Sequence, residues 1–241
     1  MAFRHYFGSP RVFRLVAAIC VLFFLLTATA MVLYPGGTAT DSTSQGYSFF
    51  RNFFSDLGMT RTPSGSPNYI SQTLLTFALT TVGVGLAIFF LALVRFFVGS
   101  RSGRWLSGLA SLFGIITGIC FIGVAFTPWN LYLQAHNQFV HWAFRAFLAA
   151  VLLDAIAVFG EKSLPKQMAW VFIAFAVLLG AYILLLTIGP SPLTPEGLVV
   201  QATGQKIIAY ASIVTILIQA LTAHRISLDD RRSLGQGGSR A

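Results

Sequence analysis

Apolar residues occur in six long runs that contain few charges, and this pattern sets the architecture of the chain. The runs lie near 12–34, 70–98, 105–127, 138–159, 167–188 and 204–223. Each is long enough to cross about 30 Å of hydrocarbon as a helix that rises about 1.5 Å per residue. Because lipid leaves backbone groups without partners, and no period-two alternation is present, the runs predict helices rather than a barrel.

We therefore expect an all-α, polytopic membrane protein. Residues 1–226 would form a single domain, a bundle of six transmembrane helices. The polar residues from 227 to 241 would form a disordered cytoplasmic tail.

The longest connection, residues 35–69, contains a segment with the pattern of a short amphipathic helix. Turn-prone residues flank it at 35–37 and 63–67. Between 47 and 58, one helical face is apolar and the opposite face is polar, with Arg51, Asn52, Ser55 and Asp56. The segment either anchors the loop at the membrane surface or turns its polar face inward and covers the outer mouth of the bundle.

Composition and charge add an orientation. Hydrophobic residues make up 56% of the chain and charged residues 10%, while the net charge is +9. Nearly all basic residues flank the runs on one side: Arg4, Arg11, Arg14, Arg95, Arg101, Arg104, Lys162, Lys166, Arg225, Arg231, Arg232 and Arg240. The positive-inside rule then predicts a multi-pass protein of the cell inner (cytoplasmic) membrane with both termini cytoplasmic. Attraction to anionic lipids explains the positive charge without a nucleic acid partner.

The first run leaves an alternative open. Three arginines precede it, and Ala28-Thr29-Ala30 is similar to a signal-peptidase site. Cleavage there would leave five helices. Retention is favoured because the apolar run continues past this site and is longer than the apolar region of a usual signal peptide.

The fourth run contains the first candidate site. Asn137, His141 and Arg145 follow one another at intervals of four residues, so they share a helical face. An ionisable group in hydrocarbon needs a partner and marks a functional-site candidate. Asp154 lies about 13 Å along the helix from Arg145 and on the opposite face, so it does not pair with it.

This leads to a hypothesis in which Asp56 of the first outer loop contacts Arg145 or His141. Together with neighbouring polar positions they would form a polar pocket at the outer membrane face. Its candidate residues are Arg51, Asn52, Ser55, Asp56, Asn137, His141, Arg145 and Gln205. Lys206 would either hold a lipid phosphate together with Arg145 or act as an interfacial anchor.

Asp56, His136 and His141 form an alternative metal-ligand set, which would suit a zinc hydrolase acting on a lipid ester or amide. The chain has no HExxH motif, and Arg145 would repel a cation. We therefore expect no metal and no cofactor, with His141 bonded to Asp56 or Asn137 instead.

Small residues recur every four positions at Ala110, Gly114 and Gly118 in the third run. This spacing allows two helix backbones to approach closely. The face is interpreted as a packing seam within one bundle, and the alternative is a partner or oligomer interface. Gly83 and Gly85 in the second run permit the same kind of contact.

Several short motifs resemble a known family. They are Ser55-Asp56-Leu57-Gly58, Pro128 at the exit of the third run, His141 in the fourth run, and Gly197-Leu198 followed by Gln201. The chain resembles, over nearly its whole length, the prokaryotic membrane family called domain of unknown function 998, and more remotely the Frag1/DRAM/Sfk1 group. The resemblance implies six membrane helices and no particular activity. Ala202 stands after Gln201 where that family often has arginine.

Three functions remain open at this level. The favoured one is a non-enzymatic lipid-interacting or accessory protein whose partners are membrane lipids. The second is a membrane-embedded lipid hydrolase that uses Asp56 and the histidines, with or without metal. The third is a small transporter, disfavoured because no run combines a central Pro or Gly break with polar residues.

Overall fold

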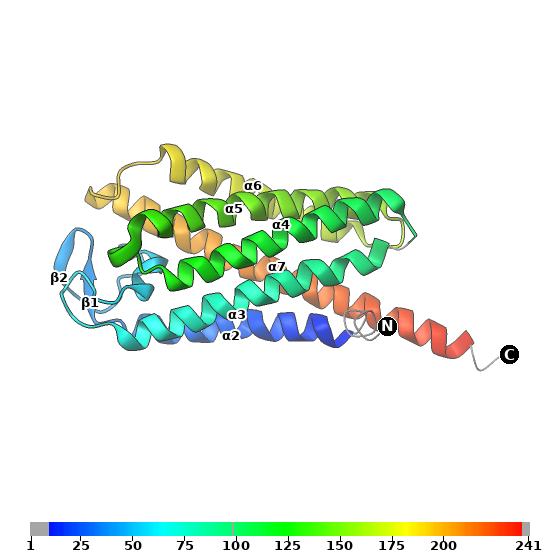
Figure 1. Ribbon diagram of the computed structural model, residues 1–241, viewed down its shortest axis with the longest axis horizontal. Helices are drawn as coiled ribbons and strands as arrows, with labels where there is room; N and C mark the ends of the chain where they lie inside the picture. Colours follow the sequence, from blue (N-terminus) through cyan, green and yellow to red (C-terminus); the bar gives the residue numbers. More distant parts are fainter. Residues whose placement is uncertain (1–9, 98, 238–241) are drawn as a thin grey trace.

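The computed structural model describes residues 10–97 and 99–237, with side chains as far as 229. Six long helices run up and down (Figure 1). They are α2 (Pro10–Val32), α3 (Tyr69–Leu93), α4 (Arg101–Phe126), α5 (Trp129–Gly160), α6 (Lys166–Ile188) and α7 (Pro195–Gly237). All six are long and apolar enough to cross a membrane. The expected all-α, multi-pass membrane protein with six spanning helices is therefore confirmed.

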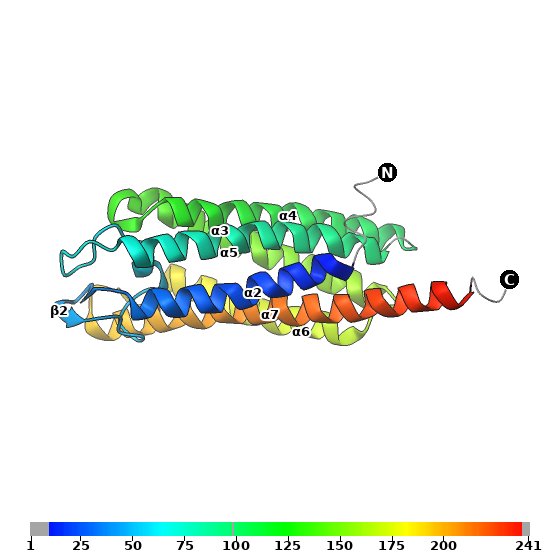
Figure 2. The same cartoon turned by 90° about the horizontal axis from the view of Figure 1, so that it is seen from below.

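The helices form two layers around a shared interior. In Figure 2, α3, α4 and α5 form one layer, while α2, α7 and α6 form the other. Each helix packs against its successor along the chain, and α7 packs against α2 to close the ring. Because the number of helices is even, α2 begins and α7 ends at the same end of the bundle (Figure 2).

A close contact joins α3 to α4. A Cβ atom built on Gly118 would collide with the backbone carbonyl of Gly83, and one built on Gly114 would collide with the ring of Phe90. Ala110 is fully buried in the same seam. Within one chain, α3 covers the face that carries Ala110, Gly114 and Gly118, as the packing-seam interpretation expects.

A short two-stranded sheet and two short helices complete the described structure. Strands β1 (Gly36–Thr38) and β2 (Asp41–Gln45) pair antiparallel, with Gly36 opposite Gln45 and Thr38 opposite Asp41. The 3-10 helix η1 (Phe54–Gly58) lies at the same end of the bundle, which we call the hairpin end. A second 3-10 helix, η2 (Val94–Phe97), continues α3 at the other end.

Two expectations for the loops differ from the structure. The helix expected over 47–58 is reduced to η1, because the Asn52 side chain accepts a hydrogen bond from the Ser48 backbone N–H at 2.9 Å and favours a turn there. The hairpin was not expected; Gly37 has φ +86°, and its backbone lies directly against that of Ser64, so a side chain would not fit.

The end of α7 also differs from the expectation. The tail expected to be disordered from residue 227 continues as helix to Gly237. Residues 238–241 lie outside the described part of the chain. The polar composition of the last turns gave no sign of the helix, which continues directly from a strongly apolar segment.

Candidate functional site

The loop between α2 and α3 folds over the hairpin end because its amide side chains bind its own backbone. The Asn52 Nδ2 atom donates to the Gly37 carbonyl at 2.8 Å. At the start of α3, the Asn68 Nδ2 atom donates to the carbonyls of Leu57 and Met59, both at 3.0 Å. These bonds hold the segment 47–60, which we call the η1 loop, against the bundle.

Asp56 lies at the centre of the η1 loop, with only 1% of its surface exposed. Its Oδ2 atom accepts hydrogen bonds from Asn52 Nδ2 and from the Phe53 backbone N–H, both at 2.9 Å. Its Oδ1 atom accepts from the indole N–H of Trp129 at 3.1 Å. Both carboxyl oxygens therefore have donors, as a buried carboxylate requires.

The protonation of Asp56 is set by two opposed effects. Burial raises the pKa of Asp56 to about 6, although the bonds from Asn52, Phe53 and Trp129 and the charge of Lys206 act to lower it. Burial, followed by the nearby Asp56 charge, likewise raises the pKa of Tyr34 and of Tyr47. The protonated and ionised forms of Asp56 are therefore closer in free energy at neutral pH than those of an exposed aspartate.

Lys206 of α7 supplies the positive charge beneath the η1 loop. Its side chain is 1% exposed, and its ammonium group donates to the backbone carbonyls of Asn52 and Ala202. The ammonium nitrogen also lies 5.5 Å from the ring centre of Tyr47. The two roles expected for Lys206, a lipid phosphate ligand beside Arg145 or an interfacial anchor, are both wrong because the η1 loop buries it.

Further bonds fasten the η1 loop to α5 and α7. The Gln205 Oε1 atom accepts from the Phe54 backbone N–H at 2.6 Å. The Thr60 backbone N–H donates a hydrogen bond to Asn130 Oδ1 at 3.2 Å. In return, Asn130 Nδ2 donates to the Thr60 hydroxyl at 2.8 Å. The η1 loop is thus a fixed cover over the bundle.

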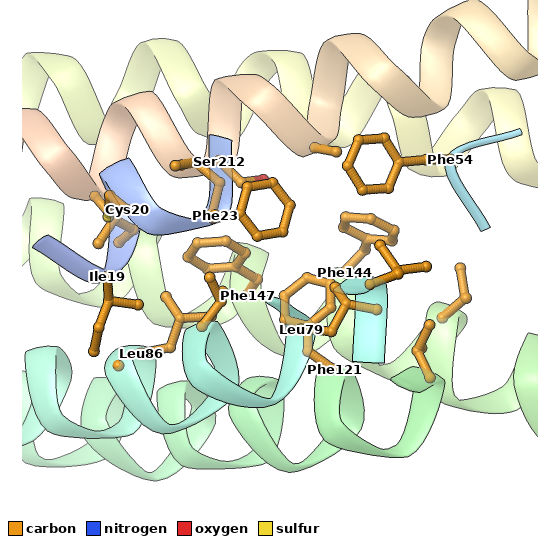
Figure 3. Close-up of a pocket in the computed structure, with 18 of the residues that line it drawn as sticks. Ile19, Cys20, Phe23, Phe54, Leu79, Leu86, Phe121, Phe144, Phe147 and Ser212 are labelled. Atoms are coloured by element: carbon orange, nitrogen blue, oxygen red, sulfur yellow. The ribbon is translucent and has the colours of Figure 1, made fainter. Parts of the chain in front are cut away.

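A cavity lies beneath this cover. Side chains from α2, α3, α4, α5, α7 and η1 line it, among them Phe23, Phe54, Leu79, Phe144 and Ile213. Figure 3 shows the labelled aromatic side chains pointing into the space between the two layers. The cavity has a volume of about 70 Å³, whereas one water needs roughly 10–15 Å³. The cavity is therefore large enough for part of an apolar ligand.

Two polar side chains face the hairpin end of the cavity. His136 Nδ1 lies 2.7 Å from the Thr127 carbonyl. Because a carbonyl only accepts, Nδ1 carries the proton, and the lone pair of Nε2 is available as an acceptor. Neither Nε2 of His136 nor the hydroxyl of Ser55 makes a hydrogen bond within the described part of the chain, and both residues line the cavity.

The structure separates the expected pocket residues into two groups. Asn52, Ser55, Asp56 and Gln205 meet at the hairpin end. Arg145 and Asn137 are exposed on the surface of α5, His141 is half-buried near Arg145, and Arg51 is exposed on the loop. The expected contact between Asp56 and Arg145 or His141 is therefore wrong: α5 turns the face that carries Arg145 away from the bundle.

The alternative metal site is not assembled. Within residues 10–97 and 99–237, no group of three His, Cys, Asp or Glu side chains is close enough to hold a metal ion. Asp56 binds Asn52, Phe53 and Trp129, while His136 binds a backbone carbonyl. Asp56, His136 and His141, the residues expected for a hydrolase, therefore do not form one site.

Sequence reasoning missed two functional neighbours. Trp129 was not considered, since a tryptophan at a helix start is usual at a membrane surface. Lys206 was assigned to the surface because it lies near the end of its run. The signal that would have linked Lys206 to Asp56 is that both residues fall at the same end of the bundle and have opposite charges.

Comparisons with family models, curated proteins and solved structures give no match to this chain.

Proposed function

We propose that this membrane protein binds a single hydrocarbon chain of a membrane amphiphile in the cavity beneath the η1 loop. The observation that carries the proposal is an apolar cavity beneath the η1 loop with two polar atoms at one end, Nε2 of His136 and the hydroxyl oxygen of Ser55, that make no hydrogen bond within the described residues. Apolar pockets with a few placed polar groups are the usual form of a small-molecule site.

The length of the cavity supports a single lipid chain as the occupant. Its walls extend on α3 from Leu75 to Leu86 and on α5 from His136 to Phe147. Eleven residues of helix span about 16 Å, which is roughly half of the ~30 Å hydrocarbon layer. One chain from one leaflet matches this length.

The polar end favours a small head group that carries a hydroxyl. The Nε2 atom of His136 accepts a hydrogen bond, and the Ser55 hydroxyl donates one, so an alcohol would satisfy both. The η1 loop, which contributes Phe54 and Ser55 to the lining, lies over this end and limits the room for a bulky phospholipid head. Long-chain alcohols of the fatty or isoprenoid type fit these restrictions.

The proposal is tested by photolabelling the protein in vesicles with hexadecanol that carries a diazirine. Leu79→Trp would fill the cavity and should reduce labelling of the cavity walls severalfold. The matched control is Leu91→Trp, which adds the same side chain to the lipid-facing surface of the same helix. Equal labelling of both variants would overturn the proposal.

The head group is tested by competition. Hexadecanol should compete with the probe better than its methyl ether, which has no proton to donate, and His136→Phe should remove this difference. Equal competition by both compounds in the unaltered protein would remove the hydroxyl from the proposal while leaving the chain site intact.

We also propose that the protein lies in the cytoplasmic membrane with both termini in the cytoplasm. The support is that basic residues cluster at the end where α2 begins and α7 ends, including Arg11, Arg14, Arg101, Arg104 and Lys162. Access of a membrane-impermeant thiol reagent to cysteines placed in the hairpin and at Lys162 tests this orientation.

A further inference from the structure

Helix α5 carries a row of polar side chains on the surface that faces away from the bundle. The row consists of Gln134, Asn137, Gln138, His141 and Arg145, which we call the α5 stripe. At about 100° per residue these positions fall within roughly 100° of the helix circumference. All are exposed except His141, which is half-buried.

Arg145 lies near mid-height of the bundle. Two residues before it, the Ala143 carbonyl accepts a bond from the hydroxyl of Thr117 at 3.5 Å. Thr117 lies nine residues before the end of α4 at Phe126, a distance of about 14 Å along the helix. Since the hydrocarbon layer is about 30 Å thick, Arg145 is close to its centre.

An arginine at this depth needs a partner. Intramembrane ionisable residues almost always face a protein interior or a water-filled cavity, because hydrocarbon does not solvate them. Arg145 instead is exposed, and its guanidinium makes no hydrogen bond or ion pair within residues 10–97 and 99–229. The structure therefore leaves the partner of Arg145 to another molecule.

A second copy of this chain does not supply the required charge. The chain has seven acidic residues: Asp41, Asp56, Asp154, Glu161, Glu196, Asp229 and Asp230. Asp154 is the acid that lies well inside a span, and it is fully buried. Asp56 is buried in the η1 loop, and the others lie in loops or near helix ends. Pairing two α5 stripes would bring Arg145 against Arg145.

We propose that the α5 stripe is a docking surface for a transmembrane helix of a different protein that carries an aspartate or glutamate at mid-membrane. The guanidinium of Arg145 would bind the carboxylate with two hydrogen bonds. The amides of Gln134, Asn137 and Gln138 would bond polar groups nearer the hairpin end of the same helix. Trp142, 59% exposed beside the stripe, adds apolar contact area.

The experiment uses the full chain in vesicles and a leucine-rich transmembrane peptide with one central aspartate. Association is measured by energy transfer between labels on the protein and on the peptide. Arg145→Leu, or replacing the peptide aspartate by leucine, should weaken association roughly 3- to 30-fold. Arg14→Leu, which removes an exposed arginine at the start of α2, should leave it unchanged.

The variants also show whether another occupant is the correct one. Unchanged association of the peptide with Arg145→Leu would overturn the proposal, provided that the thermal unfolding of the variant is normal. Self-association that is lost in Arg145→Leu would assign the surface to a second copy instead. Enrichment of anionic lipid that depends on Arg145, without peptide association, would assign it to a phosphate head group.

Discussion

Lys206 donates a hydrogen bond to the backbone carbonyl of Asn52, which lies 154 residues earlier in the chain. The side-chain amide of the same asparagine donates to Asp56. One residue of the η1 loop thus joins a buried ammonium group of α7 to a buried carboxyl group. We therefore expect the stability of the η1 loop to depend on Lys206 and on Asn52.

Lys206→Met should lower the free energy of unfolding by about 3 kcal/mol, because Asp56 then remains buried without a counter-charge. Chemical unfolding in detergent measures this. The double variant Asp56→Asn with Lys206→Met should recover part of the loss, since it removes the uncompensated charge. Recovery stays partial because both oxygens of Asp56 accept from N–H donors, and one of those donors would face the amide NH2 group of the variant. Equal losses in the single and double variants would show that the two charges are not coupled.

Asn52→Ala should lower the free energy of unfolding by about 3 kcal/mol, since it removes two donors and one acceptor from buried partners. Arg51→Ala is the matched control, because the exposed neighbour should change stability by less than about 0.5 kcal/mol. Similar values for the two variants would mean that the Asn52 bonds contribute nothing to holding the loop.

The emission of Trp129 should change with a midpoint near pH 6, because its indole donates to Asp56, whose pKa burial raises to about 6. Replacing the exposed Trp105, Trp142 and Trp170 by phenylalanine leaves Trp129 as the source of the tryptophan emission.

The free energy of unfolding should also depend on pH. The pKa of Asp56 in the folded protein exceeds its ordinary value of 3.8. The contribution of Asp56 to stability is therefore greatest below pH 3.8 and is lost as the pH rises through about 6. Asp56→Asn should abolish both effects.

Gly118→Ala should lower the free energy of unfolding by roughly 1–3 kcal/mol, because its new methyl group would collide with the Gly83 carbonyl. Gly108→Ala on the same helix meets no atom within 4 Å and should be neutral or slightly stabilising. A thermal unfolding series in one detergent compares the two. A neutral Gly118→Ala would contradict the close contact of α3 and α4.

Asp154→Asn should leave the free energy of unfolding unchanged or raise it. The Ser107 hydroxyl lies beside this carboxyl, but neither group achieves hydrogen-bond geometry within the described residues. An ionised Asp154 would be buried without a counter-charge, so a neutral amide of the same shape removes a cost. A loss as large as that of Lys206→Met would reveal a cation that binds Asp154.

The six spans followed from the sequence because a helix is the form in which an isolated apolar run satisfies its own backbone in lipid. The rotation of each helix about its own axis could not be predicted from the sequence. Helical periodicity correctly grouped Asn137, His141 and Arg145 on one face of α5, yet it could not tell whether that face pointed inward. The assumption that a buried arginine contacts Asp56 failed for this reason, and Lys206, on a different helix, is linked to Asp56 through Asn52 instead.

The pattern of hydrophobic and polar residues also did not predict the hairpin or the cavity. Residues 36–45 are small and polar, so neither helical nor strand periodicity marks them. The cavity depends on how side chains from five helices and η1 fit together, and a single sequence does not specify the packing that brings His136 and Ser55 to the same cavity.

The length of α7 has a mechanical consequence. Its 43 residues measure about 65 Å, about twice the thickness of the hydrocarbon layer, and the helix extends beyond the other five at the end opposite the hairpin (Figure 2). Lys206 and Gln205 fix the other end of this rod to the η1 loop. Gln219 donates to the Met168 carbonyl of α6 and His224 donates to the Pro10 carbonyl of α2. The middle of α7 is therefore held against both neighbouring helices, and only its last turns project as a free surface beyond the bundle.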